Sequence, residues 1–374
     1  MKELLAELRR WQDEGEAIAL ATLVRVSGSA PRNPGARLAV TRSGRTLGSV
    51  SAGCVENEVV ETAWRVLDSS SPELVSHAIG DPAGFETGLG CGGQIEVLVE
   101  CFQDDEAWRA LKAALEARRA AVLCVGLEPA AVRGRRLVVD GERTAGSVAA
   151  DLDVAIVAQA HALAGEDAAR VVTLPGRDGD VTVFFEAMQP SPRLFIVGAT
   201  HTAVSLCRMS KELGFRVAVI DPRSAWATAE RFPEADEVIP DWPGAILEGA
   251  ELDRDCFVLT LTHDPKIDLP ALAQALASPA CYVGALGSRR THAGRSAQLR
   301  EQGFGDAELA RIRGPVGLDL GSRSPEQTAL AILAEMVAVR NHTDAQPLFA
   351  GTGAIRAAGT GAIRAAGTGA IRAG

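Results

Sequence analysis

Two cysteines lie in glycine-containing segments suited to thiol chemistry. Cys54 is part of Ser51-Ala-Gly-Cys54-Val-Glu56, directly before a segment with the apolar spacing of a helix. The N-terminus of a helix stabilises a thiolate and lowers the pKa of a cysteine, and Glu56 in the first turn partly opposes this effect. Cys91 lies in Gly88-Leu-Gly-Cys-Gly-Gly93, where the glycines give it little cover. We expect Cys54, Glu56 and Cys91 to contact a cofactor, and the two cysteines to contact its metal; the alternative for Cys54 is a small packed residue.

The segment Ser27-Gly-Ser-Ala-Pro-Arg-Asn-Pro-Gly-Ala-Arg37 is a second candidate for binding. Its prolines and glycines predict a stiff loop, and Arg32 and Arg37 supply guanidinium groups that bind anions. The loop is therefore either an anion clamp or a tight turn with solvated arginines. If the strand ends converge, this loop would line one pocket with Cys54 and Cys91.

The third candidate is a nucleotide-type unit in the second half of the chain. The apolar run Leu194–Val197 predicts a buried strand, Gly198 opens a turn into a helix, and Val217–Ile220 predicts a second strand that ends at Asp221. This order is typical of a Rossmann-type fold, in which a phosphate sits at the helix N-terminus and an acidic residue about 20 positions on holds a ribose hydroxyl. Thr200 replaces the second glycine of the fingerprint, which weakens the prediction of a bound dinucleotide.

Beyond this unit, strands and helices continue to alternate, and polar residues follow the strands. In open parallel sheets the ligand crevice lies at the carboxyl ends of the strands, so we expect these residues to form a ligand-binding rim. Gly287 and Ser288, at the start of a helix, predict a second phosphate cradle. The rim residues are His201, Asp221, Arg223, His263, Asp264, Ser288, Arg289 and Arg290.

The first half of the chain contains an internal duplication. The segment 135–148 echoes 36–50, and Val181–Glu186 echoes Ile95–Glu100. Only the first copy has the two candidate cysteines, Cys54 and Cys91, and the proline-rich loop. The repeat predicts one α/β domain built from two halves, with the chemistry in the first.

These patterns predict three parts of the chain. Residues 1–188 form the N-terminal α/β domain with its internal duplication, and residues 193–345 form a Rossmann-like domain with a parallel sheet. The proline-containing segment Gln189–Pro192 links them. Residues 346–374 contain three copies of an eight-residue unit, GTGAIRAA in the first two, and are expected to be a disordered tail.

Composition narrows the functional classes. The chain has 374 residues and a formal net charge of −10, which argues against a nucleic-acid or membrane-surface binder. No apolar run reaches the roughly 18 residues of a membrane span. The seven cysteines form no close C-x-x-C pair, which suits a reducing cytoplasm.

Taken together, these motifs resemble the XdhC/CoxI family, the accessory proteins of molybdenum hydroxylases such as xanthine dehydrogenase. The similar segments include GSVSAGCVENEVVETA and CGGQIEVLVE in the first half, and LFIVGATHTAVSLC, LTHD and GALGSRRTH in the second. The family usually has glycine where this chain has Thr200 and Ala52.

The resemblance implies a chaperone that binds the molybdenum cofactor, supports its sulfuration by a cysteine desulfurase and delivers it to an apo-enzyme of the xanthine dehydrogenase type. It assigns the metal end of this pterin cofactor to Cys54 and Cys91, and we expect its phosphate end on the rim around Gly198 and Arg289. We expect a homodimer.

Two other functions remain open at this point. One is an NAD(P)-dependent oxidoreductase that uses the Rossmann unit and Asp221. The other is an adaptor for protein interactions whose pockets no longer bind a ligand.

Overall fold

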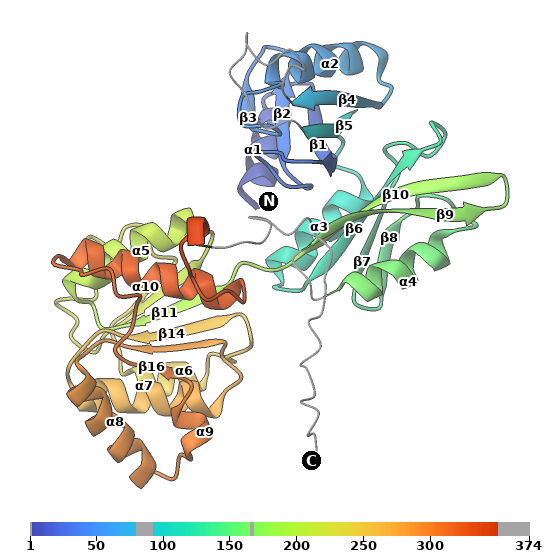
Figure 1. Ribbon diagram of the computed structural model, residues 1–374. Coiled ribbons are helices and arrows are strands. Elements are labelled where there is room, and N and C mark those ends of the chain that lie inside the picture. Colours follow the sequence, from blue (N-terminus) through green and yellow to red (C-terminus); the bar gives the residue numbers. More distant parts are fainter. Residues whose placement is uncertain (1, 80–92, 165–167, 351–374) are drawn as a thin grey trace, which may run out of the picture. The chain divides into compact units, whose positions relative to one another are not determined.

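The computed structural model in Figure 1 describes residues 2–79, 93–164 and 168–350. The chain divides into two compact units between Pro190 and Ser191, inside the segment that the sequence marks as a linker. Cys91 and the copies of the repeated tail lie outside the described residues. Among the described residues, no helix combines the length and apolar composition that a membrane span needs.

The first unit contains two antiparallel sheets of the same design (Figure 1). The first sheet has the order β3-β2-β1-β5-β4, and helix α2 packs against it through Val59, Ala63 and Val66. Its elements are β1 (Ile18–Ser27), β2 (Arg37–Thr41), β3 (Thr46–Gly48), α2 (Glu56–Ser69), β4 (Glu73–Ile79) and β5 (Gly93–Cys101).

The second sheet repeats this order with later elements of the chain, as β8-β7-β6-β10-β9. Helix α4 packs against it as α2 does against the first sheet. The elements are β6 (Ala121–Glu128), β7 (Arg136–Asp140), β8 (Arg143–Gly146), α4 (Asp153–Leu163), β9 (Ala169–Gly176) and β10 (Gly179–Met188). Because both copies have one topology, the predicted duplication is confirmed.

The two repeats share one interior, and charged residues of one repeat form ion pairs with residues of the other. Helices α1 (Lys2–Asp13) and α3 (Glu106–Glu116) pack in a core with residues of both sheets. Arg37 at the start of β2 pairs with Glu186 on β10, while its counterpart Arg136 at the start of β7 pairs with Glu100 on β5 at 2.7 Å. The ring of Trp108 on α3 lies 5.9 Å from the first guanidinium and 5.7 Å from the second.

The second unit is a parallel sheet covered by helices on both faces, which confirms the predicted Rossmann-like fold (Figure 1). The sheet order is β13-β12-β11-β14-β15-β16. Its strands are β11 (Arg193–Val197), β12 (Arg216–Ile220), β13 (Glu237–Ile239), β14 (Cys256–Thr260), β15 (Tyr282–Ala285) and β16 (Ile312–Arg313).

Helices α5 and α10 cover one face of this sheet, and α6, α7 and α8 cover the other. The helices are α5 (His201–Glu212), α6 (Pro243–Glu248), α7 (Pro265–Ala277), α8 (Arg289–Glu301), α9 (Asp306–Leu309) and α10 (Pro325–Arg340), followed by the 3₁₀ turn Leu348–Ala350. Ser324 caps α10, since its hydroxyl accepts from Gln327 N. The Gln327 side chain accepts from Arg323 N at 2.7 Å.

Candidate functional site

The loop between β3 and α2 presents Cys54 and is built around one carboxylate. Glu56 accepts hydrogen bonds from the backbone N–H groups of Ser51, Gly53 and Val55 at 2.8–3.2 Å and from the hydroxyls of Ser49 and Ser51. Burial alone would raise the pKa of Glu56, but the hydrogen bonds from these serines outweigh it and lower the pKa to about 2. The carboxylate is therefore ionised at neutral pH and fixes the loop.

The backbone of this loop is tightly turned just before the cysteine. Ala52 has a φ of 59° and Gly53 a φ of 107°, a left-handed conformation that costs energy for alanine and little for glycine. The buried hydroxyl of Ser51 accepts from the N–H groups of Cys54 and Val55, both at 3.0 Å. Cys54 is half-buried and lies two residues before the first residue of α2, as the sequence predicts.

The second repeat builds the same cap without a cysteine. Asp153, in the first turn of α4, accepts from the hydroxyl of Ser147 and from the backbone N–H groups of Val148 and Ala149. The capping carboxylate is thus part of the shared fold, and Cys54 is the addition that distinguishes the first repeat.

The predicted pairing of Cys54 with Cys91 stays a prediction, because Cys91 lies outside the described residues. Within the described part of the chain, no three or more histidine, cysteine, aspartate or glutamate side chains gather in a way that could hold a metal ion.

The predicted anion clamp needs a correction at Arg37. Its side chain is only 5% exposed, and its guanidinium pairs with both carboxylate oxygens of Glu186 and donates to the carbonyl of Gly35 at 2.9 Å. Arg37 therefore holds the two repeats together and is not available to a ligand. Arg32 is exposed, so the clamp prediction now concerns Arg32 alone.

The turn after β11 has the tight geometry of a Rossmann turn. Gly198 has a φ of 107°, and a Cβ atom there would lie 2.4 Å from Cγ2 of Thr262, so this position requires glycine. Thr200, which replaces the second glycine of the fingerprint, is the N-cap of α5, and its hydroxyl accepts from Ala203 N at 3.3 Å. The threonine thus satisfies a helix N–H group that a phosphate would otherwise bind.

Asp221 at the end of β12 is fully buried, and internal donors occupy its carboxylate. It accepts from Ala199 N at 2.7 Å and from Arg223, through the backbone N, Nε and Nη2, at 2.6–2.9 Å. Burial alone would raise the pKa of Asp221, but the hydrogen bonds from Arg223 and Ala199 lower it. A ribose hydroxyl would have to displace Arg223 to reach this carboxylate.

The remaining predicted rim residues surround the helix starts at the carboxyl ends of β11, β14 and β15. Asp264 caps α7 and accepts from Lys266 N, and Ser288 caps α8 and accepts from Thr291 N. His201 is exposed, and its Nε2 lies 3.9 Å from Glu326 Oε1 at the start of α10. His263, Arg289 and Arg290 are exposed, while Gly287, with a φ of 153°, is half-buried.

A buried ion pair behind the rim has no counterpart in the sequence prediction. Asp268 on α7 and Arg295 on α8 are paired, and Thr262 donates from its hydroxyl to Asp268 at 2.6 Å. Arg295 also donates to the carbonyls of Leu286 at 2.7 Å and Thr262 at 3.1 Å. The pair therefore fixes the loops that follow β14 and β15 relative to each other. The only indication of this ion pair in the sequence is an ionisable residue on the apolar face of a predicted helix.

Comparison with known proteins decides the family. A model of the XdhC and CoxI family matches residues 11–78, and a model of the XdhC Rossmann domain matches residues 194–336, together more than half of the chain. This chain belongs to the XdhC and CoxI family. The first match includes Arg32, Arg37, Cys54 and Glu56, and the second includes every predicted rim residue.

The alignments of this chain with named relatives cover almost its whole length. It is 27% identical to a probable xanthine dehydrogenase subunit from Bacillus subtilis, over 88% of this chain and 94% of the relative. It is 29% identical to the molybdenum cofactor insertion chaperone PaoD of Escherichia coli, over 88% of this chain and 86% of that protein. The crystal structure of a xanthine dehydrogenase from Bacillus halodurans matches with a TM-score of 0.75 and 25% identity, over 93% of this chain and 98% of that one.

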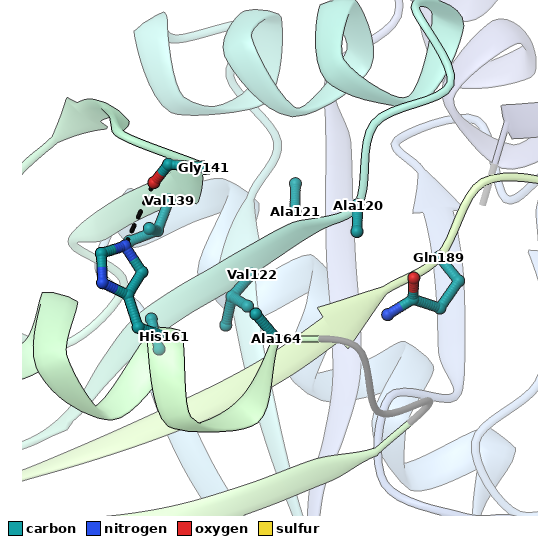
Figure 2. Close-up of a pocket in the computed structure, with 9 residues that line it drawn as sticks. Ala120, Ala121, Val122, Val139, Gly141, His161, Ala164 and Gln189 are labelled. Carbon is teal, nitrogen blue, oxygen red and sulfur yellow. Dashed lines mark hydrogen bonds between the residues drawn. The ribbon is translucent and has the colours of Figure 1, made fainter.

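An apolar hollow in the second repeat of the first unit contains none of the predicted site residues (Figure 2). His161 is its one ionisable side chain, and that ring bonds the carbonyl of Gly141 at 3.1 Å. The lining offers no group for chemistry on a cofactor. It consists of Ala120, Ala121, Val122, Val139, Gly141, Ala160, His161, Ala164 and Gln189.

Proposed function

We propose that this chain is a cytoplasmic accessory protein that binds the molybdenum cofactor as cargo and delivers it to a molybdenum hydroxylase of the xanthine dehydrogenase type. The observation that carries this proposal is the likeness, over 88% of the chain, to a relative named a molybdenum cofactor insertion chaperone. The other named relative, a probable component of a xanthine dehydrogenase, points to the class of enzyme that would receive the cargo.

The loop around Glu56 supports a role for Cys54 at the metal end of the cargo. A soft thiol suits a metal that is bound by sulfur, and the loop holds the half-buried Cys54 on a fixed backbone. The fixed backbone means that little entropy is lost when the thiol engages a ligand. Since the second repeat has the same cap and no cysteine, the thiol is not needed for the fold.

The rim of the second unit supports binding of the phosphate end. Exposed Arg289 and Arg290 begin α8, where backbone N–H groups and guanidinium groups both favour an anion. His201 and His263 are exposed at neighbouring helix starts and add donors for the polar edge of a pterin.

The proposed cargo role involves two partner enzymes and a second copy of this chain. A cysteine desulfurase would supply the sulfur for the bound cofactor, the apo-hydroxylase would receive the product, and the chain would act as a homodimer. Sulfur transfer requires the metal end to stay accessible, which a half-buried thiol in a surface loop permits.

Purification from cells that make the cofactor tests the proposal. We expect the wild-type chain to carry molybdenum and pterin, measured by elemental analysis and by fluorescence of the oxidised pterin, and to activate an apo-hydroxylase. The Cys54→Ser variant and the Cys54→Ser/Cys91→Ser double variant should lose most of both. Cys281→Ser is the matched control, because Cys281 is an exposed thiol that we assign no role. Normal loading and delivery by the double variant would refute the assigned roles.

The NAD(P)-dependent alternative has weaker structural support. Thr200 already caps α5 and Asp221 is enclosed by Arg223 and Ala199, so the two groups expected to meet a dinucleotide are engaged. Titration with NADH, followed by its fluorescence, separates the alternatives: saturable binding in the micromolar range would favour the oxidoreductase.

A further inference from the structure

A large aromatic side chain lies half-exposed beside the Rossmann turn of the second unit. Trp226 belongs to the loop between β12 and β13, and 51% of it is accessible to solvent. Single exposed apolar residues are common on protein surfaces, so exposure alone indicates nothing. The contacts that hold this tryptophan in place are what distinguish it.

Arg231 braces the ring of Trp226 against the turn that follows β11. Its guanidinium lies 4.7 Å from the ring centroid, and its Nη1 donates to the carbonyl of Trp226 at 2.9 Å and to the carbonyl of Ala199 at 3.0 Å. The same guanidinium lies 5.6 Å from the ring of Phe232, which is buried in the core. One arginine thus joins the loop of Trp226 to the residue that follows Gly198.

The backbone on the other side of Trp226 is also fixed. Its N–H donates to the carbonyl of Arg223 at 2.9 Å, and Ala227 N donates to the same carbonyl at 3.2 Å. Arg223 is in turn bound to the buried Asp221. The indole is therefore preorganised, and a ligand that uses it loses little conformational entropy on binding.

The position of this indole determines which ligand it suits. Trp226 follows the carboxyl end of β12, next to the end of β11, where ligands of open parallel sheets bind. Arg231 lies over the ring, and 51% of the residue stays accessible to solvent, which leaves surface for a flat group to contact. Planar heterocycles stack on aromatic rings with little dependence on their exact identity.

From these contacts we infer that Trp226 is a stacking platform for a planar heterocycle that carries a phosphate group. The inference rests on the proposed cargo function, and it assigns the ring-binding part of the rim to the loop after β12. The ring is either the pterin of the cofactor or the base of a nucleotide, and the two share the same stacking chemistry.

Binding of small probes to the full-length chain tests the inference. The probes are a pterin monophosphate, cytidine and guanosine monophosphates, and inorganic phosphate, each titrated by calorimetry. For the ring-bearing probe that binds, we expect Trp226→Ala to weaken affinity by about fivefold to 100-fold, and Trp226→Phe to retain most of it. Affinity for inorganic phosphate should stay within twofold in both variants. Trp64→Ala is the matched control, because it removes another accessible tryptophan, on α2 of the first unit.

The outcomes separate this inference from the proposed function. If the wild-type chain binds none of the ring-bearing probes, or if Trp226→Ala binds each of them within twofold of wild type, the platform is refuted, whether or not the chain carries molybdenum. If affinity for inorganic phosphate falls as much as affinity for the ring-bearing probes, stacking is also refuted. If Trp226→Ala weakens binding of the ring-bearing probes alone, but the purified wild-type chain carries no molybdenum, the stacking role of Trp226 is supported and the cargo role is rejected. Urea unfolding of both Trp226 variants shows whether the fold is intact, and Trp226→Phe decides the matter if the alanine variant is unstable.

Discussion

Replacement of Glu56 by glutamine is the most direct test of how the fold presents Cys54. The glutamine keeps the size of the side chain but removes the charge. It also places an NH₂ group among the donors from Ser49, Ser51, Gly53 and Val55, which then lose an acceptor. The loop should therefore loosen while the rest of the first repeat stays folded.

The magnitude follows from the pKa of Glu56. A fall from 4.5 to about 2 corresponds to roughly 3 kcal/mol of stabilisation of the ionised form. Because Glu56 is only partly buried, solvent screening reduces this to about 1–2 kcal/mol. A lowered pKa in the folded state means that the stabilisation is complete above about pH 4.5 and is lost as the pH falls from there towards 2.

Two measurements check this reasoning. Urea unfolding at pH 7 should show Glu56→Gln less stable than wild type by about 1–2 kcal/mol, and the difference should shrink as the pH falls below about 4.5. A loss of that size changes the opening equilibrium of the loop by a factor of about 5–30. We therefore expect alkylation of Cys54, followed by peptide mass spectrometry, to become about fivefold faster or more.

Asp153→Asn provides the matched control. Asp153 accepts equivalent hydrogen bonds in the second repeat, which has no cysteine at that position. The control should lose stability without changing the alkylation rate of Cys54. Equal acceleration in both variants, or a Glu56→Gln variant as stable as wild type with unchanged alkylation, would show that the carboxylate does not fix the loop.

Three further predictions concern the framework. Arg37→Leu should destabilise the chain by about 3–5 kcal/mol because it leaves the largely buried Glu186 without its partner, whereas the Arg37→Leu/Glu186→Leu double variant should recover most of the loss; additive losses in urea unfolding would contradict this. Gly198→Ala should cost about 2–4 kcal/mol, since its φ is positive and the new Cβ would meet Thr262, and a variant with an unchanged melting temperature would contradict the geometry. Ser324→Ala should cost about 1 kcal/mol through loss of the α10 cap, with Ser324→Asp close to wild type in the same assay.

Local pattern was sufficient to predict the first strands of the second unit and the repeat in the first. Runs such as Leu194–Val197 are apolar enough to identify buried parallel strands, and β11 and β12 lie where these runs predict them. Residues 36–50 and 135–148 are similar in sequence, and both segments form the same hairpin. The similarity therefore indicates a shared topology.

Partners far apart in the chain could not be predicted in the same way. Arg37 looks like a ligand-binding arginine because its partner Glu186 lies 149 residues away. Asp221 was correctly placed at a strand end, yet the sequence gives no sign that Arg223 and Ala199 already occupy its carboxylate. The pair Asp268 and Arg295 was missed for the same reason, since neither residue belongs to a motif.

The crossed ion pairs of the first unit point to its evolutionary origin. In a two-fold dimer, residue i of one protomer meets residue j of the other, and j meets i in return. Arg37 with Glu186 and Arg136 with Glu100 obey this rule across two segments of a single polypeptide. This is the arrangement that duplication and fusion of the gene for a two-fold dimer would leave. The two halves of a fused chain can diverge while their common interior is kept, so that each molecule carries one Cys54 loop.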